Sequence, residues 1–245
     1  MKRGALLAVL ALASTAATAN ELSAGVITSY SPAVYLGAGS NIVPFPMIGY
    51  EGEKVFFRGT SAGLGLLPLG APVNVIFRVE YDPRTLKPSD SNDADIKMLD
   101  ERKSGVLGGV TFQVNNIMGT FEGTIGSDIA NNHNGIYAEA VWKKPFHFGL
   151  YGLTPELGYA FNSDRLNNHL YGVSDTEAAR TRFDAFDAGW SGRFFVGISS
   201  YTYLARNVRL VGSIRYNKLD SELAVSPIID NDDSISGTLG VSYVF

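Results

Sequence analysis

Cysteine is absent from this 245-residue chain, and so is any helix-length apolar run. Without cysteine the fold has no disulfide framework, so backbone pairing and packing must supply its stability. No stretch of about 18 apolar residues is free of charge, so no segment qualifies as a membrane-spanning helix. A membrane protein with this sequence must therefore cross as a β-barrel. The formal net charge of -4 argues against nucleic acid as a partner.

The first 20 residues, MKRGALLAVLALASTAATAN, have the three parts of a secretory signal peptide. Lys2 and Arg3 supply the positive start, residues 5–12 are apolar, and Ala17-Thr18-Ala19 is a small-x-small cleavage site. We expect residues 1–19 to be removed and residues 20–245 to form a single domain.

The last nine residues, GTLGVSYVF, alternate between two faces. Leu239, Val241, Tyr243 and Phe245 share one face, and small or polar residues dominate the other, as in a β-strand. Such an apolar terminus suits a strand that closes a barrel in lipid; the alternative is the last strand of a soluble β-sandwich. Phe245, with Tyr243 before it, also resembles the signal by which outer-membrane proteins are recognised for assembly.

The same alternation recurs along the chain. Residues 73–81 give the clearest internal strand, and residues 106–125 predict a hairpin around Asn115-Asn116. Long polar connections at 83–104, 162–189 and 220–233 alternate with short turns. We therefore predict an all-β fold: a transmembrane antiparallel up-and-down β-barrel of about 10–12 strands, with short periplasmic turns and longer extracellular loops.

Four segments depart from simple alternation. Residues 43–50 carry two prolines, which predicts an irregular strand or one at the rim. Residues 54–58 form a strand that is expected to continue, kinked, through the glycine-rich residues 59–65. Residues 143–146 are expected to turn the chain. Residues 174–182 predict a short helix, with a Ser as N-cap and a Glu three residues later.

The three histidines, His133, His147 and His169, lie in predicted loops or turns. A metal site would need several ligands converging with matching spacing, so we interpret them as surface residues and expect no metal or cofactor. A Ser174–His169 dyad of the kind used by outer-membrane lipid hydrolases has no indicated third partner. We therefore expect no enzymatic activity.

Charged residues recur on the strand faces predicted to line the lumen. They are Arg78, Glu80, Glu122, Glu139, Arg209 and Arg215. Isolated charges there would be costly, so we expect the three arginines to pair with the three glutamates in a narrow bore that conducts little. The alternative is a wet, selective pore.

Several pieces of sequence, in their order and spacing, carry a resemblance to a known family. They are VPFPMIGYEGEKVFFRG, LDERKSG, NNHNGI, TPELGYAFNSD, YGVSDTEAARTRF, SPII and the terminal aromatic strand. Over essentially the whole mature length the chain resembles the MipA/OmpV family, the MltA-interacting proteins of the Gram-negative outer membrane. The resemblance implies an outer-membrane barrel embedded in lipid. It also implies a scaffold that bridges a periplasmic lytic transglycosylase and a penicillin-binding murein synthase.

The family has no established catalytic residues, so none is assigned. The positions that match its motifs are Pro44, Tyr50, Glu51, Gly52, Arg58, Asp100, Arg102, Tyr171, Gly172, Val173, Ser174, Ser226 and Pro227. Other members are described as adhesins or surface antigens, which would use the loops at 83–104 and 162–189. A narrow porin for small solutes is a further alternative.

Overall fold

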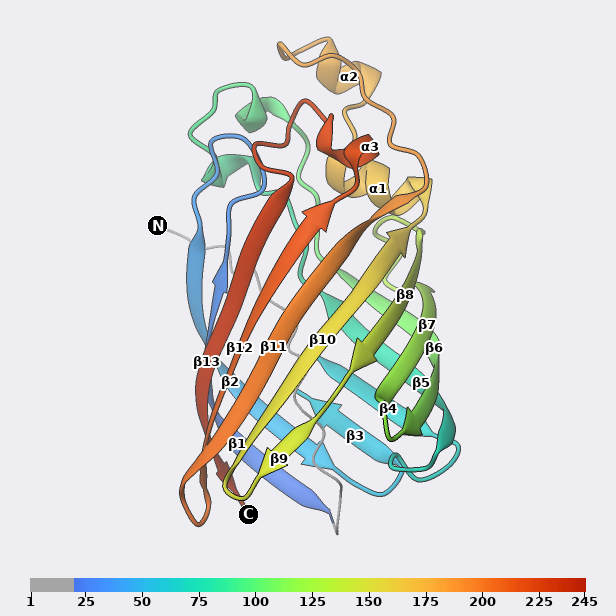
Figure 1. Cartoon of the computed structure of the whole chain (residues 1–245). Coiled ribbons are helices and arrows are strands. Elements are labelled where there is room, and N and C mark those ends of the chain that lie inside the picture. Colours follow the sequence, from blue (N-terminus) through green and yellow to red (C-terminus); the bar gives the residue numbers. More distant parts are fainter. Residues whose placement is uncertain (1–19) are drawn as a thin grey trace.

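The computed structural model describes residues 20–245, so the predicted signal peptide lies outside the described residues. Its strands, shown in Figure 1, are β1 (Glu21–Ser31), β2 (Asn41–Glu51), β3 (Val55–Arg58), β4 (Ser61–Gly65), β5 (Val73–Asp82), β6 (Gly105–Asn116), β7 (Gly119–Asp128), β8 (Ile136–Lys143), β9 (Phe146–Phe148), β10 (Tyr151–Asn162), β11 (Ser191–Ala205), β12 (Val208–Leu219) and β13 (Asp233–Val244).

These strands form a closed antiparallel barrel. Each pairs with its neighbours, β1 pairs with β13, and β10 pairs with β11, which closes the ring. β8 and β9 pair with successive stretches of β10, so the thirteen segments count as twelve strands. The predicted up-and-down barrel is confirmed.

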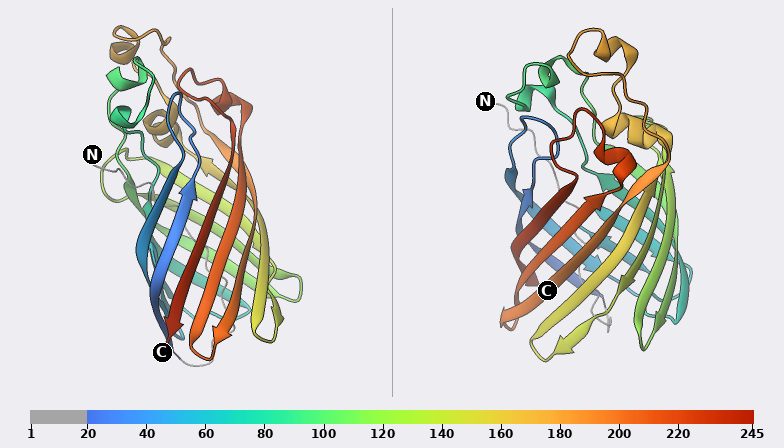
Figure 2. Two further views of the ribbon diagram at one scale, coloured as in Figure 1. Left: turned by 90° about the vertical axis from the view of Figure 1, so that its left-hand side faces the viewer. Right: turned by 45° about the horizontal axis from the view of Figure 1, so that its top comes forward.

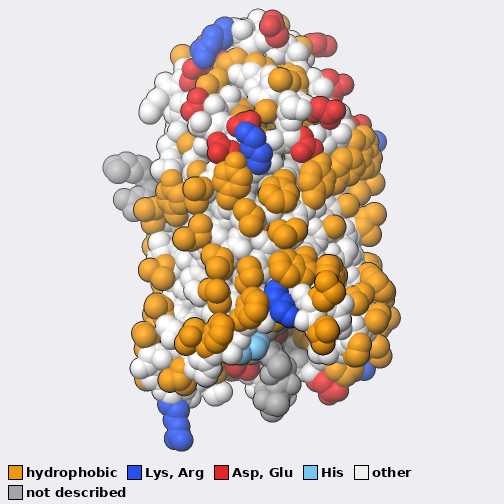
Figure 3. All heavy atoms as spheres, viewed as in Figure 1, with side chains coloured by type: hydrophobic (Ala, Val, Ile, Leu, Met, Phe, Trp, Pro, Cys, Tyr) orange, Lys and Arg blue, Asp and Glu red, His pale blue; other side chains and the backbone are white. Residues whose placement is uncertain are grey.

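Alternating side chains give the barrel its two surfaces. On β6, Phe112 is 53% exposed on the outside, while the neighbouring Thr111 is 1% exposed and faces the lumen. Figure 3 shows apolar side chains spread over the barrel wall, with acidic and basic groups gathered mainly near its two ends. An apolar outer surface of this kind suits lipid and would be unfavourable in water.

The two ends of the barrel differ. Long connections meet at one end, here called the loop end, and short turns meet at the other, the turn end (Figures 1 and 2). β13 ends at the turn end, as expected for an even strand number. None of the helices within residues 20–245 is long and apolar enough to cross a membrane.

A folded cap covers the loop end. It contains the short helices α1 (Asp164–Tyr171), α2 (Asp175–Ala178) and α3 (Ser221–Ala224), and the 3-10 turns η1 (Pro88–Asp90) and η2 (Ile96–Met98). One apolar core there includes Ile96, Val173 and Ile228, and a second includes Leu166 and Leu223. These residues come from different connections, so the loops pack on one another as a small folded layer.

Two expectations about β2 to β4 are wrong. The proline-containing residues form the regular strand β2, which pairs with β1 over its whole length. Residues 59–65 do not continue β3; the chain reverses at Gly59, whose φ is +61°, and β4 returns beside β3. Glycine adopts this left-handed conformation without the steric cost that a Cβ would bring.

Three further boundaries differ from expectation. Lys144-Pro145 separates β8 from β9, which pair with successive stretches of β10, and the reversal lies at Gly149, whose φ is +64°. The predicted helix over 174–182 is only the four residues of α2, and the longer α1 before it was missed. The β6–β7 reversal lies at Ile117-Met118, because Asn115 and Asn116 still belong to the ladder.

The ladder is interrupted beside β2. β3 pairs with β2 only at residues 49–51, and no strand within residues 20–245 pairs with the same edge at 42–47. The backbone oxygen of Ile48 points to that edge, where it accepts from Gly59, so alternate residues Pro44 and Pro46 face it too. Proline has no N–H to offer another strand. We call this unpaired edge the seam.

Candidate functional site

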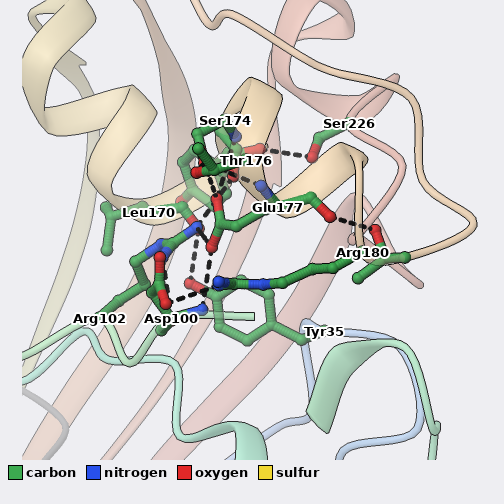
Figure 4. A network of polar contacts seen from close by, with 12 residues as sticks. Tyr35, Asp100, Arg102, Leu170, Ser174, Thr176, Glu177, Arg180 and Ser226 are labelled. Atoms are coloured by element: carbon green, nitrogen blue, oxygen red, sulfur yellow. Dashed lines mark hydrogen bonds and ion pairs between the residues drawn. The ribbon is translucent and has the colours of Figure 1, made fainter. Parts of the chain in front are cut away.

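The cap is held by a buried ion pair between two connections. Nη2 of Arg102, after β5, lies 2.7 Å from Oε1 of Glu177 on α2. The side chains of Arg102 and Glu177 are 10% and 2% exposed. Figure 4 shows both pointing toward one another in the centre of the network. Removal of either partner would leave a buried charge without its counterion.

Glu177 satisfies several donors at once. Ser174 and Glu177 form a capping box at the start of α2, and the Asp100 N–H also donates to Oε1 of Glu177 at 2.9 Å. Burial alone would raise the pKa of Glu177. The N–H groups of Ser174 and Asp100 and the Arg102 guanidinium outweigh burial and hold this pKa at about 2.

The remaining motif residues of the cap tie loops together through their backbones. Arg102 donates to the carbonyl of Gly172, and Ser226 donates to the carbonyl of Tyr171 at 2.6 Å. A Cβ on Gly172 would lie 2.6 Å from the Asn168 oxygen, so glycine is required there. Val173 forms an isolated bridge with Phe186.

Two other cap positions lie at the margins of this network. Arg180 reaches the carboxylate of Asp100 at 2.6 Å, on an exposed edge of the cap. Pro227 sits between the buried residues Ser226 and Ile228. Motif residues from three separate connections therefore meet in one loop-end structure, which the sequence order did not reveal.

A second group of motif residues lies at the turn end. Arg58 contacts both carboxylate oxygens of Glu51, with Nε–Oε1 at 2.5 Å and Nη2–Oε2 at 2.9 Å. The pair joins β2 to β3 on either side of the turn. A Cβ on Gly52 would lie 2.9 Å from the Tyr50 ring, so the turn packs closely on that ring. The last motif position, Pro44, lies on the seam.

Arg78 lies between two of the expected carboxylates of the lumen. Its Nη2 is 3.4 Å from Glu80, and its Nη1 is 3.9 Å from Glu122. Glu122 also accepts from Lys143 at 3.0 Å, a cation that the sequence analysis missed. Lys143 is the last residue of β8, and its cross-strand neighbour on β7 is Thr120.

The other two lumen arginines have different partners from those expected. Nη2 of Arg215 lies 2.5 Å from Glu156, and Arg209 lies 2.8 Å from Glu21; neither is paired with Glu80, Glu122 or Glu139. Glu156 lies opposite Gly197, which is itself opposite Arg215, so the closed sheet brings the two charges together. Glu139 instead accepts a hydrogen bond from Tyr137.

Two of the three histidines meet in the cap. The rings of His133 and His169 lie 5.2 Å apart, and burial lowers the pKa of both. His147 lies at the other end, near Tyr201. Ser174 is engaged with Glu177, and His169 Nε2 contacts the Lys103 carbonyl, so no Ser–His dyad forms. No cluster of three metal-ligating side chains occurs within residues 20–245.

The terminal aromatic pair lies at the turn end. Phe245 is 69% exposed, its N–H donates to the Leu22 carbonyl at 2.9 Å, and its ring meets that of Tyr243 edge-on at 5.0 Å. Its backbone therefore joins the last residue to β1, while its ring stays on the outer surface.

Comparisons with known proteins agree with this architecture. The family described as "MltA-interacting protein MipA" matches residues 24–245. The "MltA-interacting protein" of Escherichia coli K12 is 30% identical over 99% of this chain and 96% of its own length. "Putative outer membrane protein YiaT" of the same strain is 29% identical over 94% of this chain and 93% of its own length.

A more distant relative and one solved structure complete the comparison. "Outer membrane protein OmpV" of Vibrio cholerae is 26% identical over 80% of this chain and 76% of its own length. The COG4313 outer membrane channel of Pseudomonas putida F1 has a TM-score of 0.41 at 10% identity, covering 94% of this chain and 97% of that one. The chain belongs to the MltA-interacting protein (MipA) family and is a protein of the bacterial outer membrane.

Proposed function

We propose that this barrel is a non-enzymatic scaffold whose turn end binds a periplasmic lytic transglycosylase, with a penicillin-binding murein synthase as a second partner. The name of the relative that is 30% identical supports the first partner class. The observation that carries the proposal is an apolar turn tip that no other part of the described chain covers.

Ile117 at the tip of the β6–β7 turn is 91% exposed, and Met118 beside it is 65% exposed. Leu150, in the β9–β10 turn, is 68% exposed, and Leu204, near the end of β11 before the β11–β12 turn, is 64% exposed. Exposed aliphatic side chains at the tips of turns gain from burial against a partner protein. The turn end thus has several exposed aliphatic side chains that a partner protein on that side of the membrane could bury.

The Ile117–Met118 tip is also held in place. The Trp142 indole donates to the Met118 carbonyl at 3.0 Å, and the Met118 N–H donates to the Asn116 side chain at 2.8 Å. Lys144 donates to the Ile117 carbonyl. A tip fixed before binding loses less conformational entropy when a partner docks.

The interior favours a scaffold over a porin. An apolar cluster of Ile27, Met47 and Val211 fills part of the lumen, and ion pairs cross other parts. The folded cap lies over the loop end. Planar-bilayer recording should therefore show no large open-channel steps; steps whose ion selectivity changes in Arg215→Glu would favour the porin.

Photocrosslinking in intact cells tests the scaffold directly. A photoreactive phenylalanine analogue at Ile117 should capture a periplasmic murein hydrolase or synthase, identified by mass spectrometry. The same analogue at Ser89, exposed in the loop-end connection 83–104, is the matched control and should capture neither. Capture of surface ligands from Ser89 alone would overturn the scaffold and favour an adhesin.

A further inference from the structure

A cavity of about 240 Å³ lies inside the barrel beneath the cap. We call it the chamber. Tyr35, Leu170 and Tyr171 line it from the cap, and Leu107 and Leu219 line it from the wall. It also receives five carboxylates and three arginines: Glu80, Asp82, Glu139, Glu156, Asp232, Arg84, Arg193 and Arg215.

Arg193 is the unusual member of this set. It makes no hydrogen bond or ion pair with another residue of 20–245, and its Nε atom is buried without a partner. Its cross-strand neighbours are Ala160 on β10 and Leu219 on β12, and Glu139, which lies across Ala160 on β8, accepts from Tyr137 instead. A buried guanidinium nitrogen without a hydrogen-bond partner is unfavourable, which points to a missing acceptor of negative charge beside Arg193.

The carboxylates of the chamber are already occupied. Asp82 takes two nitrogens of Arg84, and Glu156 takes Arg215. Glu80 accepts from Arg78, Asp232 accepts from Lys218, and Glu139 accepts from Tyr137. The Nη1 atom of Arg84, in contrast, is buried and has no partner among the described residues. The chamber therefore has buried donors without a partner, on Arg193 and Arg84, whereas none of its described carboxylate oxygens is buried without a partner.

We propose that the chamber binds a small amphipathic anion, an organic carboxylate whose charged group lies against Arg193 and whose apolar part lies against Leu107 and Leu219. Planar guanidinium groups bind carboxylates with strong, charge-assisted hydrogen bonds. Apolar walls with a few convergent polar groups are typical of small-molecule sites. The cavity volume limits the ligand to roughly the size of a single aromatic ring with its carboxylate.

The seam gives this ligand a route to the chamber. A second cavity, of about 100 Å³, lies between the β1–β2 connection and residues 85–91, and it shares Ser31, Tyr35 and Thr85 with the chamber. The unpaired edge of β2 leads toward this second cavity, which is lined in part by Asn41. Since Pro44 and Pro46 offer no N–H, that edge is poorly suited to closure by another strand.

Binding of benzoate to the folded mature protein in dodecyl maltoside tests the proposal by isothermal titration calorimetry. Benzoate should bind, and benzamide and inorganic phosphate should each bind at least about tenfold more weakly. Benzamide is a neutral isostere that lacks the negative charge, and phosphate lacks the apolar ring. Equal binding of benzoate and benzamide, or no binding of benzoate at millimolar concentration, would overturn the proposal.

Variants locate the site. Arg193→Gln should weaken benzoate binding at least about tenfold, as expected for loss of a charged hydrogen bond, while Arg193→Lys should retain part of it. Arg206→Gln removes an exposed arginine from the β11–β12 turn and should leave binding unchanged. Ser199 also lines the chamber. Ser199→Phe places a bulky ring in the chamber without changing any charged residue, and it should abolish benzoate binding. Unchanged binding in a folded Arg193→Gln or Ser199→Phe protein contradicts this location.

Discussion

The loop end and the turn end of this barrel satisfy the backbone groups at the ends of the strands in different ways. At the loop end, long connections form apolar cores of their own and bury the ion pair Arg102–Glu177. At the turn end, reversals of a few residues bury almost nothing and expose Ile117 at 91%. Both ends must satisfy backbone groups where strands stop, but only the loop end does so with a folded layer.

The residues that match the family motifs and the residues of the proposed binding surface lie mostly at opposite ends of the barrel. Most of the motif positions contribute to the cap, where they hold loops together and leave little free chemistry. The proposed partner surface at the turn end is built from Ile117 and Met118, which belong to no recognised motif. The motif residues are therefore concentrated where loops must be held together, and the candidate interface is found from the exposed apolar residues of the turn end.

The largest effect is expected from the cap ion pair. Arg102→Met leaves Glu177 buried without its counterion, and we expect a loss of about 3–5 kcal/mol in the stability of the cap. Limited proteolysis of the loops on intact cells, and urea unfolding of the purified barrel, measure it. Arg182→Met removes an exposed arginine that contacts Asp93 and should change either readout little.

A double variant checks the cause of that loss. Arg102→Met combined with Glu177→Leu removes both charges and should recover much of the stability, because no charge is left buried alone. If the double variant is as unstable as the sum of the single ones, the ion pair is not the reason for the cap's stability.

Acid should loosen the loop end before the turn end. The pKa of Glu177 is depressed to about 2, against 4.5 for an ordinary glutamate, so its contribution is fully present above pH 4.5. That contribution is lost progressively as the pH falls from about 4.5 to 2. Proteolysis of the cap with an acid-active protease should therefore increase across this window. The Glu177→Gln protein should lack this part of the pH dependence, and a parallel pH profile would contradict the assignment.

The terminal aromatic pair should matter for assembly more than for final stability. Edge-to-face contact between Phe245 and Tyr243 is worth about 0.5–1.5 kcal/mol, so Phe245→Asp removes a modest contact from the folded barrel. We expect severalfold less protein in the outer membrane, measured by heat-modifiable mobility on gels. Normal levels of Phe245→Asp would mean that the terminal residue is not an assembly signal. Val244→Thr, a polar change at the neighbouring position, is the control.

The wall of the barrel could be predicted from sequence because alternation is a local signal. Phe112 and Thr111 fall on opposite faces whatever the topology. Contacts across the lumen or between loops are not local. Arg215 reaches Glu156 only because the sheet closes, and Arg102 meets Glu177 only because two long connections fold together. The hairpin at Gly59 was missed because a strand of four residues has too few alternations to show its period.

The smallest effect is expected at the turn end, in the pair Glu51–Arg58. Both side chains are less than one-fifth exposed and the contact is bidentate, yet the pair lies beside a short turn at the barrel's edge. We expect Arg58→Met to cost about 0.2–1 kcal/mol in urea unfolding, in the range of a solvent-accessible pair, with Arg58→Lys intermediate since it loses the planar fork. Part of any cost reflects lost packing of the guanidinium over the Phe56 ring, 4.2 Å away, which Met retains better than Ala. A cost in Arg58→Met equal to that in Arg102→Met would show that the turn end relies on buried charge as the cap does, and the contrast between the two ends would fail.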